Sequence, residues 1–416
     1  MTTGLAQEGR SDPAADIRDL IAAASEVPEL PDKIWFQKTA AAVIDADRCV
    51  GCGGCIAACP SGSLAIADDG LPTLVRMCTG CSSCWDFCPL AGLRVERLTR
   101  GGDSIGTHRR EPHDAGSVEA TYSARARVRA GDAQDGGVVT ALLVALLESG
   151  VIDGAIVTRR HDAFTAEPVL ATTADELRAA AGGVYEQSYP LRLLTDPLPD
   201  GIRRLAMVGT PCQLSVLRAL QAYPWPYRQS AASCVVLAIG LFCTRSFDGT
   251  RLMRALVTRG LALDQVARLD IRDGVLAALG RGGERLVEVP VAEVRSASLR
   301  GCDECTDFGA LAADLAVGNL GSTPGYSTVI VRSRTGAAAW ARAADALEIG
   351  PAPDMAAVEG VARRNRRRAE RHLHRGYAPE GPLWVSYAEH LAAYGSTDRA
   401  PCAPPPHRCQ TYRVSC

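Results

Sequence analysis

The sequence predicts an α/β fold in two unequal units, a small cysteine-rich domain followed by a larger domain on a mixed or mostly parallel sheet. Three observations lead to this prediction. The chain has 416 residues, which favours two or three domains. Half of its 16 cysteines fall within residues 41–99, in two matching blocks. After about residue 120, short apolar stretches alternate with helix-like stretches, as in βαβ folds, although a mixed α+β sheet remains an alternative.

Changes in composition set the expected domain boundaries. Residues 1–40 are polar and rich in alanine, which predicts a flexible leader with one helix at 16–24. The cysteine-rich domain should span 41–99, a linker 100–120, the α/β domain 121–345, a helical arginine-rich extension 346–395, and a mobile tail rich in cysteine and proline 396–416. Within the extension, residues 363–375 include seven arginines and two histidines, which indicates a solvated helix face or a docking strip for an acidic partner.

The elements of the α/β domain follow from apolar runs and from helix start and stop signals. Strands are expected at 125–129, 154–158, 205–208, 235–242, 266–271, 286–289, 314–317 and 328–332. Helices are expected at 138–148, 174–181, 211–222 and 249–258. The third of these helices opens on Pro211, because proline is favoured at the first helical position.

The charge balance excludes several classes of function. The formal net charge is −2 at pH 7, so bulk electrostatics cannot drive binding to nucleic acid or to an anionic membrane. Lys33 and Lys38 are the only lysines among the 45 cationic residues. We interpret this strong preference for arginine over lysine as a bias in codon usage. The longest apolar runs have ten residues, whereas a membrane-spanning helix needs about 20. The N-terminus also lacks an export signal. We therefore expect a cytoplasmic, reduced protein whose clustered cysteines bind metal.

The two N-terminal blocks share the spacing C-x2-C-x2-C-x3-C-P, which in bacterial ferredoxins holds 4Fe–4S clusters. In two-cluster ferredoxins the fourth cysteine of each block ligates the other cluster. The predicted ligands are therefore Cys49, Cys52, Cys55 and Cys88 for one cluster, and Cys78, Cys81, Cys84 and Cys59 for the other. Paired zinc sites are the alternative, but zinc usually takes C-x2-C pairs with longer gaps and often histidine, which this stretch lacks.

A second cysteine constellation is expected in the α/β domain. The candidate ligands of a third cluster are Cys212, Cys243, Cys302 and Cys305. Cys212 falls in the first turn of a helix and Cys243 at the end of a strand, so both should lie at the carboxyl edge of the sheet, where such folds bind ligands. Cys302 and Cys305 supply a C-x2-C pair. Cys234 begins its strand and is excluded. A structural zinc and unconnected thiols remain alternatives, and the tail residues Cys402, Cys409 and Cys416 are expected to be mobile free thiols.

A glycine-rich loop at 131–140 joins a predicted strand to an apolar helix. Gly136 and Gly137 would let a diphosphate approach the free amides at the start of that helix. The loop matches neither G-x-G-x-x-G nor a P-loop, so a plain strand–helix turn is an equal alternative. A second flexible loop, at 318–325, could surround a planar cofactor or merely turn.

These stretches resemble the beta subunits of coenzyme F420-reducing hydrogenases and F420-dependent formate dehydrogenases. The matching segments are DGGVVTALLVALLESGVIDGAIV at 135–157, VGTPCQLSVLR at 208–218, IGLFC at 239–243, CDECTDFGALAADLAVGNLG at 302–321 and TVIVRSRTG at 328–336. One departure stands out. The family usually has a Gly-Ser-Lys-Tyr element before GTPCQ, whereas this chain has Gly182-Gly183-Val184-Tyr185 and lacks the lysine.

The resemblance implies FAD and a further 4Fe–4S cluster in the α/β domain, with coenzyme F420 as substrate. Residues expected to hold the flavin are Asp135, Gly136, Gly137, Val138, Thr140, Thr210, Gln213, Gly318 and Gly321. Hydride chemistry would take place on the flavin, and no catalytic side chain is singled out. Electrons would pass between F420 and FAD, then through the clusters to a redox partner or a catalytic subunit such as a hydrogenase, a formate dehydrogenase or another reductase.

The sequence is compatible with two other functions and with assembly into a homo-oligomer. The same cofactors suit a ferredoxin-dependent reductase of an organic substrate. A pure electron-transfer subunit without its own substrate site is the other alternative, and its flavin content would distinguish it.

Overall fold

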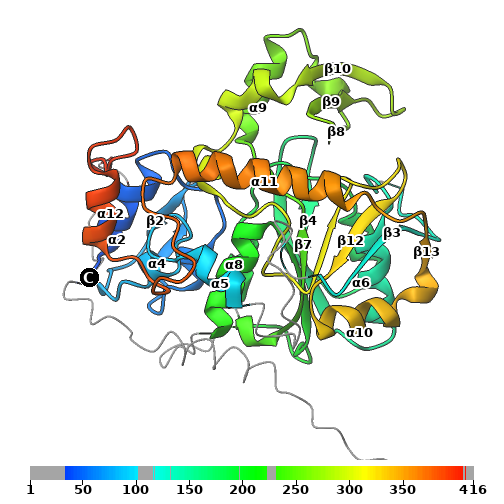
Figure 1. The fold of residues 1–416 in the computed structure, drawn as a ribbon, viewed down its shortest axis with the longest axis horizontal. Coiled ribbons are helices and arrows are strands. Elements are labelled where there is room, and N and C mark those ends of the chain that lie inside the picture. The colour runs from blue at the N-terminus through cyan, green and yellow to red at the C-terminus, as the bar shows by residue number, and fades with distance from the viewer. Residues whose placement is uncertain are drawn as a thin grey trace, which may run out of the picture.

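A computed structural model describes residues 33–101, 116, 118–131, 133–195, 197–222, 231–405 and 408. The expected leader helix at 16–24, most of the linker, and Cys409 and Cys416 lie outside the described residues. Figure 1 shows a small N-terminal domain packed against one side of a larger α/β domain, with a separate lobe above the sheet.

The α/β domain is built on an eight-stranded mixed sheet. In spatial order its strands are β13 (Leu347–Ile349), β3 (Ala120–Ala126), β12 (Ser327–Val331), β11 (Leu315–Gly318), β7 (Val235–Leu241), β6 (Leu205–Gly209), β4 (Gly154–Arg160) and β5 (Ala166–Ala171). The central strands β11, β7, β6 and β4 are mutually parallel, and the flanking pairs are antiparallel. The predicted fold class is therefore confirmed.

Helices cover both faces of this sheet. On one face lie α6 (Val138–Glu148), α7 (Ala174–Ala179) and α10 (Arg334–Arg342). The other face packs against α8 (Pro211–Ala222) and, beyond it, against the N-terminal domain. Val50 and Phe87 of that domain share one hydrophobic core with Met207 of β6 and Val216 of α8. The two domains therefore form one continuous packed body.

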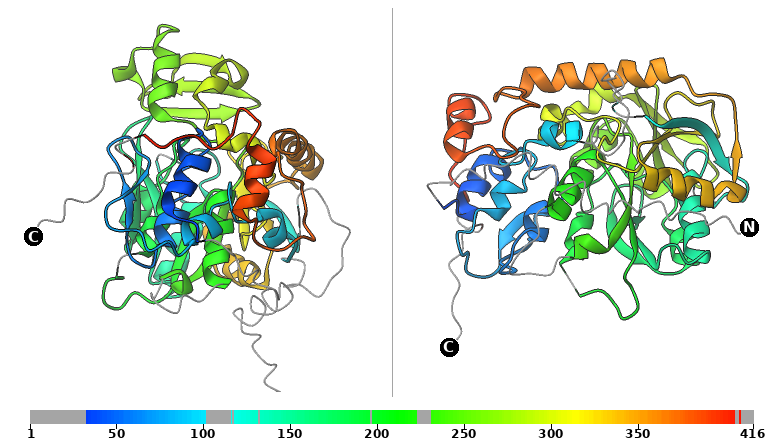
Figure 2. Two further views of the ribbon diagram at one scale, coloured as in Figure 1. Left: turned by 90° about the vertical axis from the view of Figure 1, so that its left-hand side faces the viewer. Right: turned by 60° about the horizontal axis from the view of Figure 1, so that its bottom comes forward.

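Two of the expected strands do not join the main sheet. Residues 266–271 and 286–289 contribute instead to a three-stranded antiparallel sheet of β8 (Arg268–Arg272), β9 (Val275–Leu279) and β10 (Arg285–Pro290). Together with α9 (Gly249–Val257) this sheet forms the small lobe, which stands apart from the body in Figure 2. Tight turns explain the difference: Asp273 and Gly274 have positive φ and join β8 directly to β9. Neighbouring strands joined in this way pair with each other and not with a distant sheet.

The N-terminal domain begins earlier than predicted. Its helical segment comprises α2 (Phe36–Thr39) and the π-helix η1 (Ala40–Ile44), so the expected boundary at residue 41 cuts through it. Ile34 and Phe36 are already buried in the domain core. The remaining elements of this domain are α3 (Gly54–Ala57), β1 (Leu64–Ile66), β2 (Pro72–Leu74), α4 (Ser83–Asp86) and α5 (Val95–Gly101). Short 3-10 helices elsewhere are η3 (Pro190–Leu194), η4 (Ala231–Cys234), η5 (Leu263–Gln265), η6 (Val291–Ala297), η7 (Arg300–Glu304) and η8 (Ala344–Ala346).

The C-terminal segment, residues 373–405 and Arg408, returns to the N-terminal domain. It follows α11 (Met355–His372), contains α12 (Tyr387–Tyr394) and lies beside α2 in Figure 1. The Cys402 amide donates to the Ala41 carbonyl at 2.8 Å, and Arg408 pairs with Asp45 and Asp69, both at 2.9 Å. The described part of the expected mobile tail is therefore packed against the domain. Within the described residues, no helix is long and apolar enough to cross a membrane.

Trp85 joins the C-terminal segment to the cysteine-rich domain. Its side chain is fully buried, and its indole nitrogen donates to the Val385 carbonyl at 2.9 Å. We expect Trp85→Ala to lower the free energy of unfolding by about 3–5 kcal/mol, since it removes both buried area and a hydrogen bond. Urea denaturation measures the loss. Trp35→Ala is the control, because Trp35 is 44% exposed and should cost much less. Equal losses for the two variants would contradict this packing.

Candidate functional site

The two N-terminal cysteine blocks fold alike. In each, the residue after the second cysteine adopts a left-handed conformation, with φ of 82° at Gly53 and 66° at Ser82, and a four-residue helix follows. The residue before the second cysteine has a positive φ as well, and it is a glycine in both blocks, Gly51 and Gly80. The backbone therefore turns sharply on both sides of that cysteine, which brings three thiols of each block into one loop.

Each fourth cysteine lies beside the other block, as the ferredoxin pattern predicts. Burial raises the pKa of the Cys84 thiol, and the neighbouring thiols that raise it further are Cys78, Cys81 and Cys59. Burial likewise raises the pKa of the Cys88 thiol to about 12, with a contribution from Cys49. We call Cys49, Cys52, Cys55 and Cys88 the first set, and Cys78, Cys81, Cys84 and Cys59 the second set.

The four cysteines predicted in the α/β domain also converge. Burial raises the pKa of the Cys243 thiol well above its usual value, and Cys302, Cys212 and Cys305 add to the effect. All four line one small cavity. They form the third set. Cys234 lies in η4, before β7, and is not among the lining residues.

Local hydrogen bonds hold the third set in place. The Cys212 sulfur lies 3.2 Å from the Thr210 hydroxyl, and the Ser246 amide donates to the Cys302 sulfur at 3.4 Å. Among the described residues, no three histidine, cysteine, aspartate or glutamate side chains are placed to share one metal ion. A 4Fe–4S cluster binds each thiolate through a different iron and does not require that closeness.

The three sets follow one another in space. After burial, the largest influence that raises the pKa of the Cys52 thiol is Cys212 of the third set. Cys55 of the first set is similarly influenced by Cys84 of the second set. Close backbone packing supports this order, because Gly301 lies against the Arg48 carbonyl and has no room for a side chain. The first set therefore lies between the other two.

A main cavity of about 1460 Å³ opens at the carboxyl edge of the central strands. Eight of the nine residues predicted to hold a flavin line it: Asp135, Gly137, Val138, Thr140, Thr210, Gln213, Gly318 and Gly321. Cys243 of the third set lines it as well. This volume exceeds the roughly 300–1,000 Å³ of a pocket for one drug-sized ligand, so it can hold a dinucleotide and a second molecule.

Gly136 is the one predicted flavin-binding residue that does not line the main cavity, so the prediction is corrected at this position. It is absent from the lining residues, and its amide donates to the Ser327 hydroxyl at 3.2 Å. A Cβ at this position would lie 2.5 Å from the Ala124 carbonyl oxygen. Gly136 is therefore required for the close approach of the loop to β3 and β12. Gly137 is the N-cap of α6 with φ of 69°, so the backbone alone already accounts for a glycine there.

Side chains around the loop tie it to the small lobe. Asp135 pairs with Arg272 of β8, but burial still raises the pKa of Asp135 because the pairing offsets the effect only in part. Gln134, which the sequence did not single out, donates to the Tyr185 hydroxyl and to Asp270, both at 2.7 Å. Val184 lines the cavity where the family pattern has lysine.

One face of the arginine-rich helix α11 packs against the site. The other face is solvated, as the sequence indicated, and carries the exposed residues Arg363, Arg364, Arg367 and Arg371. Asn365 donates to the Cys305 carbonyl at 3.1 Å, and Arg368 donates to the carbonyls of Thr244 and Cys302 at 2.9 and 3.0 Å. The buried positions of the helix are Val358, Ala362, Asn365 and Ala369. Their helical spacing was a readable signal, but the density of arginine obscured it.

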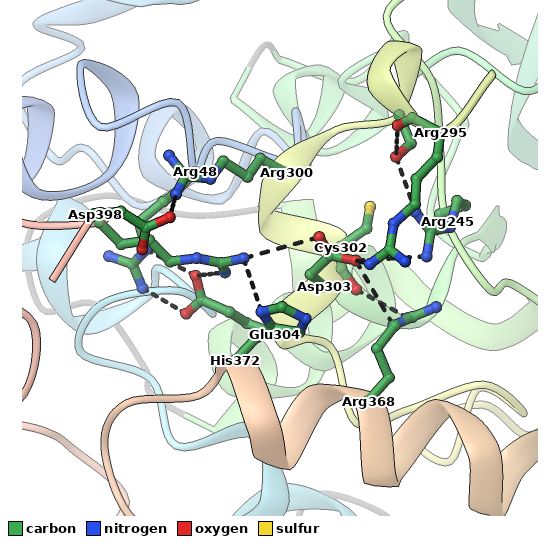
Figure 3. A network of polar contacts seen from close by, with 12 residues as sticks. Arg48, Arg245, Arg295, Arg300, Cys302, Asp303, Glu304, Arg368, His372 and Asp398 are labelled. Carbon is green, nitrogen blue, oxygen red and sulfur yellow. Dashed lines mark hydrogen bonds and ion pairs between the residues drawn. The ribbon is translucent and has the colours of Figure 1, made fainter. Parts of the chain in front are cut away.

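The most buried ion pair of the site joins the first set to the third. Arg48, next to Cys49, donates through Nε and Nη2 to the two carboxylate oxygens of Glu304 at 2.9 and 2.7 Å, and both side chains are fully buried. Glu304 also accepts from Arg399 and Tyr394 of the C-terminal segment, at 2.6 and 2.7 Å. Burial raises the pKa of Glu304, but these three partners together hold it below its usual value. Figure 3 shows Arg48 and Glu304 facing each other across the network.

Comparisons with known proteins agree with this architecture. Family models match for "Coenzyme F420 hydrogenase/dehydrogenase, beta subunit N-term" at residues 121–195, for its "C terminus" counterpart at 202–354, and for a "4Fe-4S dicluster domain" at 41–110. The coenzyme F420 hydrogenase subunit beta of Methanothermobacter thermautotrophicus is 33% identical over 250 residues, which are 58% of this chain and 88% of that protein.

Two further relatives extend the comparison. The coenzyme F420-dependent sulfite reductase of Methanocaldococcus jannaschii is 31% identical over 304 residues, 71% of this chain and 46% of that protein. A chain in the solved F420-reducing NiFe hydrogenase complex of Methanosarcina barkeri is 28% identical, with a TM-score of 0.60 over 64% of this chain and 94% of that chain.

His390 gives the network a pH dependence. Burial and the adjacent Arg48 lower its pKa to about 3, and its Nε2 lies 3.2 Å from Arg48 Nη1. In the unfolded chain its pKa is about 6.5, so only the unfolded state gains a proton between pH 6.5 and 3. Stability from this group is therefore complete above pH 6.5 and is lost as the pH falls. We expect His390→Phe to remove about 2 kcal/mol of the stability difference between pH 7 and pH 5.

Chemical denaturation at both pH values measures this difference. His390→Gln should flatten the pH dependence equally, because neither substituent titrates, although the two variants differ in hydrogen bonding. Curves parallel to that of the wild type in both variants would contradict the assignment.

Proposed function

Because the chain belongs to the coenzyme F420 hydrogenase/dehydrogenase beta subunit family and carries a 4Fe–4S dicluster domain, it is an iron-sulfur electron-transfer protein, and we propose that it is a flavoprotein oxidoreductase acting on coenzyme F420. In this proposal electrons move between F420 and a partner protein by way of FAD and the clusters. One observation carries it: the third cysteine set adjoins both the main cavity and Cys52 of the first set.

FAD fits the main cavity at the start of α6. The first-turn amides of this helix are free to bind a diphosphate. Val138 and Thr140 of the helix and Thr210 before α8 line the same cavity. The chemistry that FAD supplies when bound is the conversion between a hydride, which carries two electrons, and single electrons.

The third set fits a 4Fe–4S cluster by its donor chemistry. Four thiols with no disulfide partner surround one small cavity, and amide and hydroxyl groups contact their sulfurs. Such contacts stabilise thiolates in a buried place. Cys212, Cys243, Cys302 and Cys305 would therefore hold this cluster between the flavin and the N-terminal domain.

The second set is the proposed point of exchange with a partner. Cys81 is the only exposed cysteine among the twelve predicted ligands. Met77, one residue before Cys78, is 76% exposed, and Val75 is 43% exposed. A relative of this chain is a component of a hydrogenase complex. We propose a protein partner that docks on this side of the domain and exchanges single electrons with the second set.

Anaerobic mixing tests the proposed electron donor. We expect reduced coenzyme F420 to bleach the flavin absorbance of the purified holoprotein, whereas NADH should not. Stopped-flow absorbance measures the bleaching. Bleaching by reduced ferredoxin and not by reduced F420 would instead favour a ferredoxin-dependent reductase. Protein that contains iron but no flavin would favour a pure electron-transfer subunit.

A charge placed at the start of α6 tests the flavin site. A glutamate at residue 140 is favourable for the helix dipole, but it repels a diphosphate bound at the free amides. We expect Thr140→Glu to keep the wild-type Tm and iron content and to weaken FAD binding about tenfold or more, equivalent to about 1.4 kcal/mol. Thr140→Gln matches it in size without charge and should bind FAD normally. Unchanged FAD affinity in Thr140→Glu would overturn this placement.

A further inference from the structure

The loop that carries Cys302 and Cys305 lies in a strongly positive environment. Its two carboxylates, Asp303 and Glu304, face five guanidinium groups within 4.0 Å: those of Arg48, Arg245, Arg295, Arg368 and Arg399. The next carboxylate along the chain, Asp307, is itself faced by Arg332. Figure 3 shows arginines converging on Asp303 from several directions. Four of these five side chains are at most 14% exposed, so the loop carries a surplus of buried positive charge that the described carboxylates around it do not balance.

The surplus lies next to the sulfur ligands. Arg368 donates to the Cys302 carbonyl at 3.0 Å, and its side chain is only 14% exposed. Arg245, 9% exposed, pairs with Asp303 at 3.4 Å and donates to the Ser298 hydroxyl at 2.9 Å. Both guanidinium groups therefore lie beside Cys302, where positive charge favours negative charge on the third set.

Reduction of a four-thiolate 4Fe–4S cluster is a change in negative charge. Four thiolates and the oxidised core together carry a charge of about −2, which becomes about −3 when one electron is added. Nearby positive charge stabilises the more negative state, and net charge is one of the factors that set cluster potentials. Inside a protein this effect is much less screened than at the surface.

We infer that Arg368, together with Arg245, raises the reduction potential of the third cluster and so makes it the favoured acceptor of electrons from the main cavity. This inference rests on the proposed function, because it requires a cluster on the third set. Arg368 belongs to α11, which begins at Met355, one residue beyond the end of the family match at 354. The tuning charge is therefore supplied from outside the segment that the family model matches.

Arg368 and Arg48 play different parts in this arrangement. Arg48 is held by both oxygens of Glu304, so its charge is offset by a partner of its own. Arg368 pairs with Asp303, a carboxylate that also pairs with Arg245, Arg295 and Arg399. The hydrogen bonds that Arg368 donates go to backbone carbonyls. Its charge is the less compensated, and Arg368, which also lines the main cavity, is accordingly a tuning residue.

Redox titration of the reconstituted holoprotein, followed by electron paramagnetic resonance, tests the inference. The third-cluster signal is the one that disappears in Cys305→Ser, with loss of roughly four of about twelve irons. We expect Arg368→Gln to shift the electron equilibrium of that cluster at least about tenfold toward oxidation, a fall of about 59 mV for a one-electron couple. Arg368→Lys keeps the charge and should restore most of the potential. Arg367→Gln, exposed on the same helix, is the control and should leave it unchanged.

The possible outcomes separate the inference from the proposed function. If Cys305→Ser loses no iron and no signal, the third set holds no cluster and the proposed function fails. If the cluster is present but Arg368→Gln keeps the wild-type potential, the inference is overturned and the proposed function stands. If Arg368→Gln itself loses four irons, Arg245→Gln decides. Arg245 is the other residue that the inference names, pairs with Asp303 at 3.4 Å and is 9% exposed, so its loss should lower the potential, and an unchanged potential would overturn the inference.

Discussion

The buried ion pair between Arg48 and Glu304 is the interaction on which the arrangement of the cysteine sets depends. Removing two charges from water is costly, and the pair is stable only because each remaining donor and acceptor finds a partner. Arg48 also donates to the Ala42 and Leu90 carbonyls, both at 2.8 Å, and its guanidinium lies 4.2 Å from the centre of the Tyr394 ring. Three segments far apart in the chain must therefore be in place together before this pair can form.

Fixing this pair fixes the relation between the two domains. Arg48 precedes the first ligand of the first set, and Glu304 lies between two cysteines of the third, so a shift of either domain would break a bidentate contact. The shared apolar core around α8 resists the same movement. The proposed electron path needs constant separations between the cysteine sets, and one polar contact and one apolar core would maintain them. The C-terminal segment contributes Arg399 and Tyr394, which both donate hydrogen bonds to Glu304.

The sequence was most informative where the determinants of structure are local. The two N-terminal blocks and the turn into α8 at Pro211 depend on a few neighbouring residues, and the structure brings the twelve predicted cysteines into the three expected groups. Cys212 and Cys243 lie at the carboxyl edge of the sheet as expected, because that expectation follows from strand direction alone. The positions of α11 and of the C-terminal segment depend on contacts between residues 60 to 363 positions apart, which no local pattern encodes. Gly136 was misassigned for a similar reason, since its neighbour Ser327 lies on a distant strand.

The near absence of lysine acquires a physical meaning in this setting. Arg48, Arg375 and Arg399 are each less than 10% exposed and each pairs with a carboxylate, in the case of Arg48 and Arg375 through both oxygens. A buried lysine readily loses its proton, whereas a guanidinium stays charged and matches both carboxylate oxygens at once. Codon usage can explain why arginine is abundant, but it cannot explain why these arginines lie inside. Their charges therefore form an electrostatic field around the cysteine sets that changes little with pH.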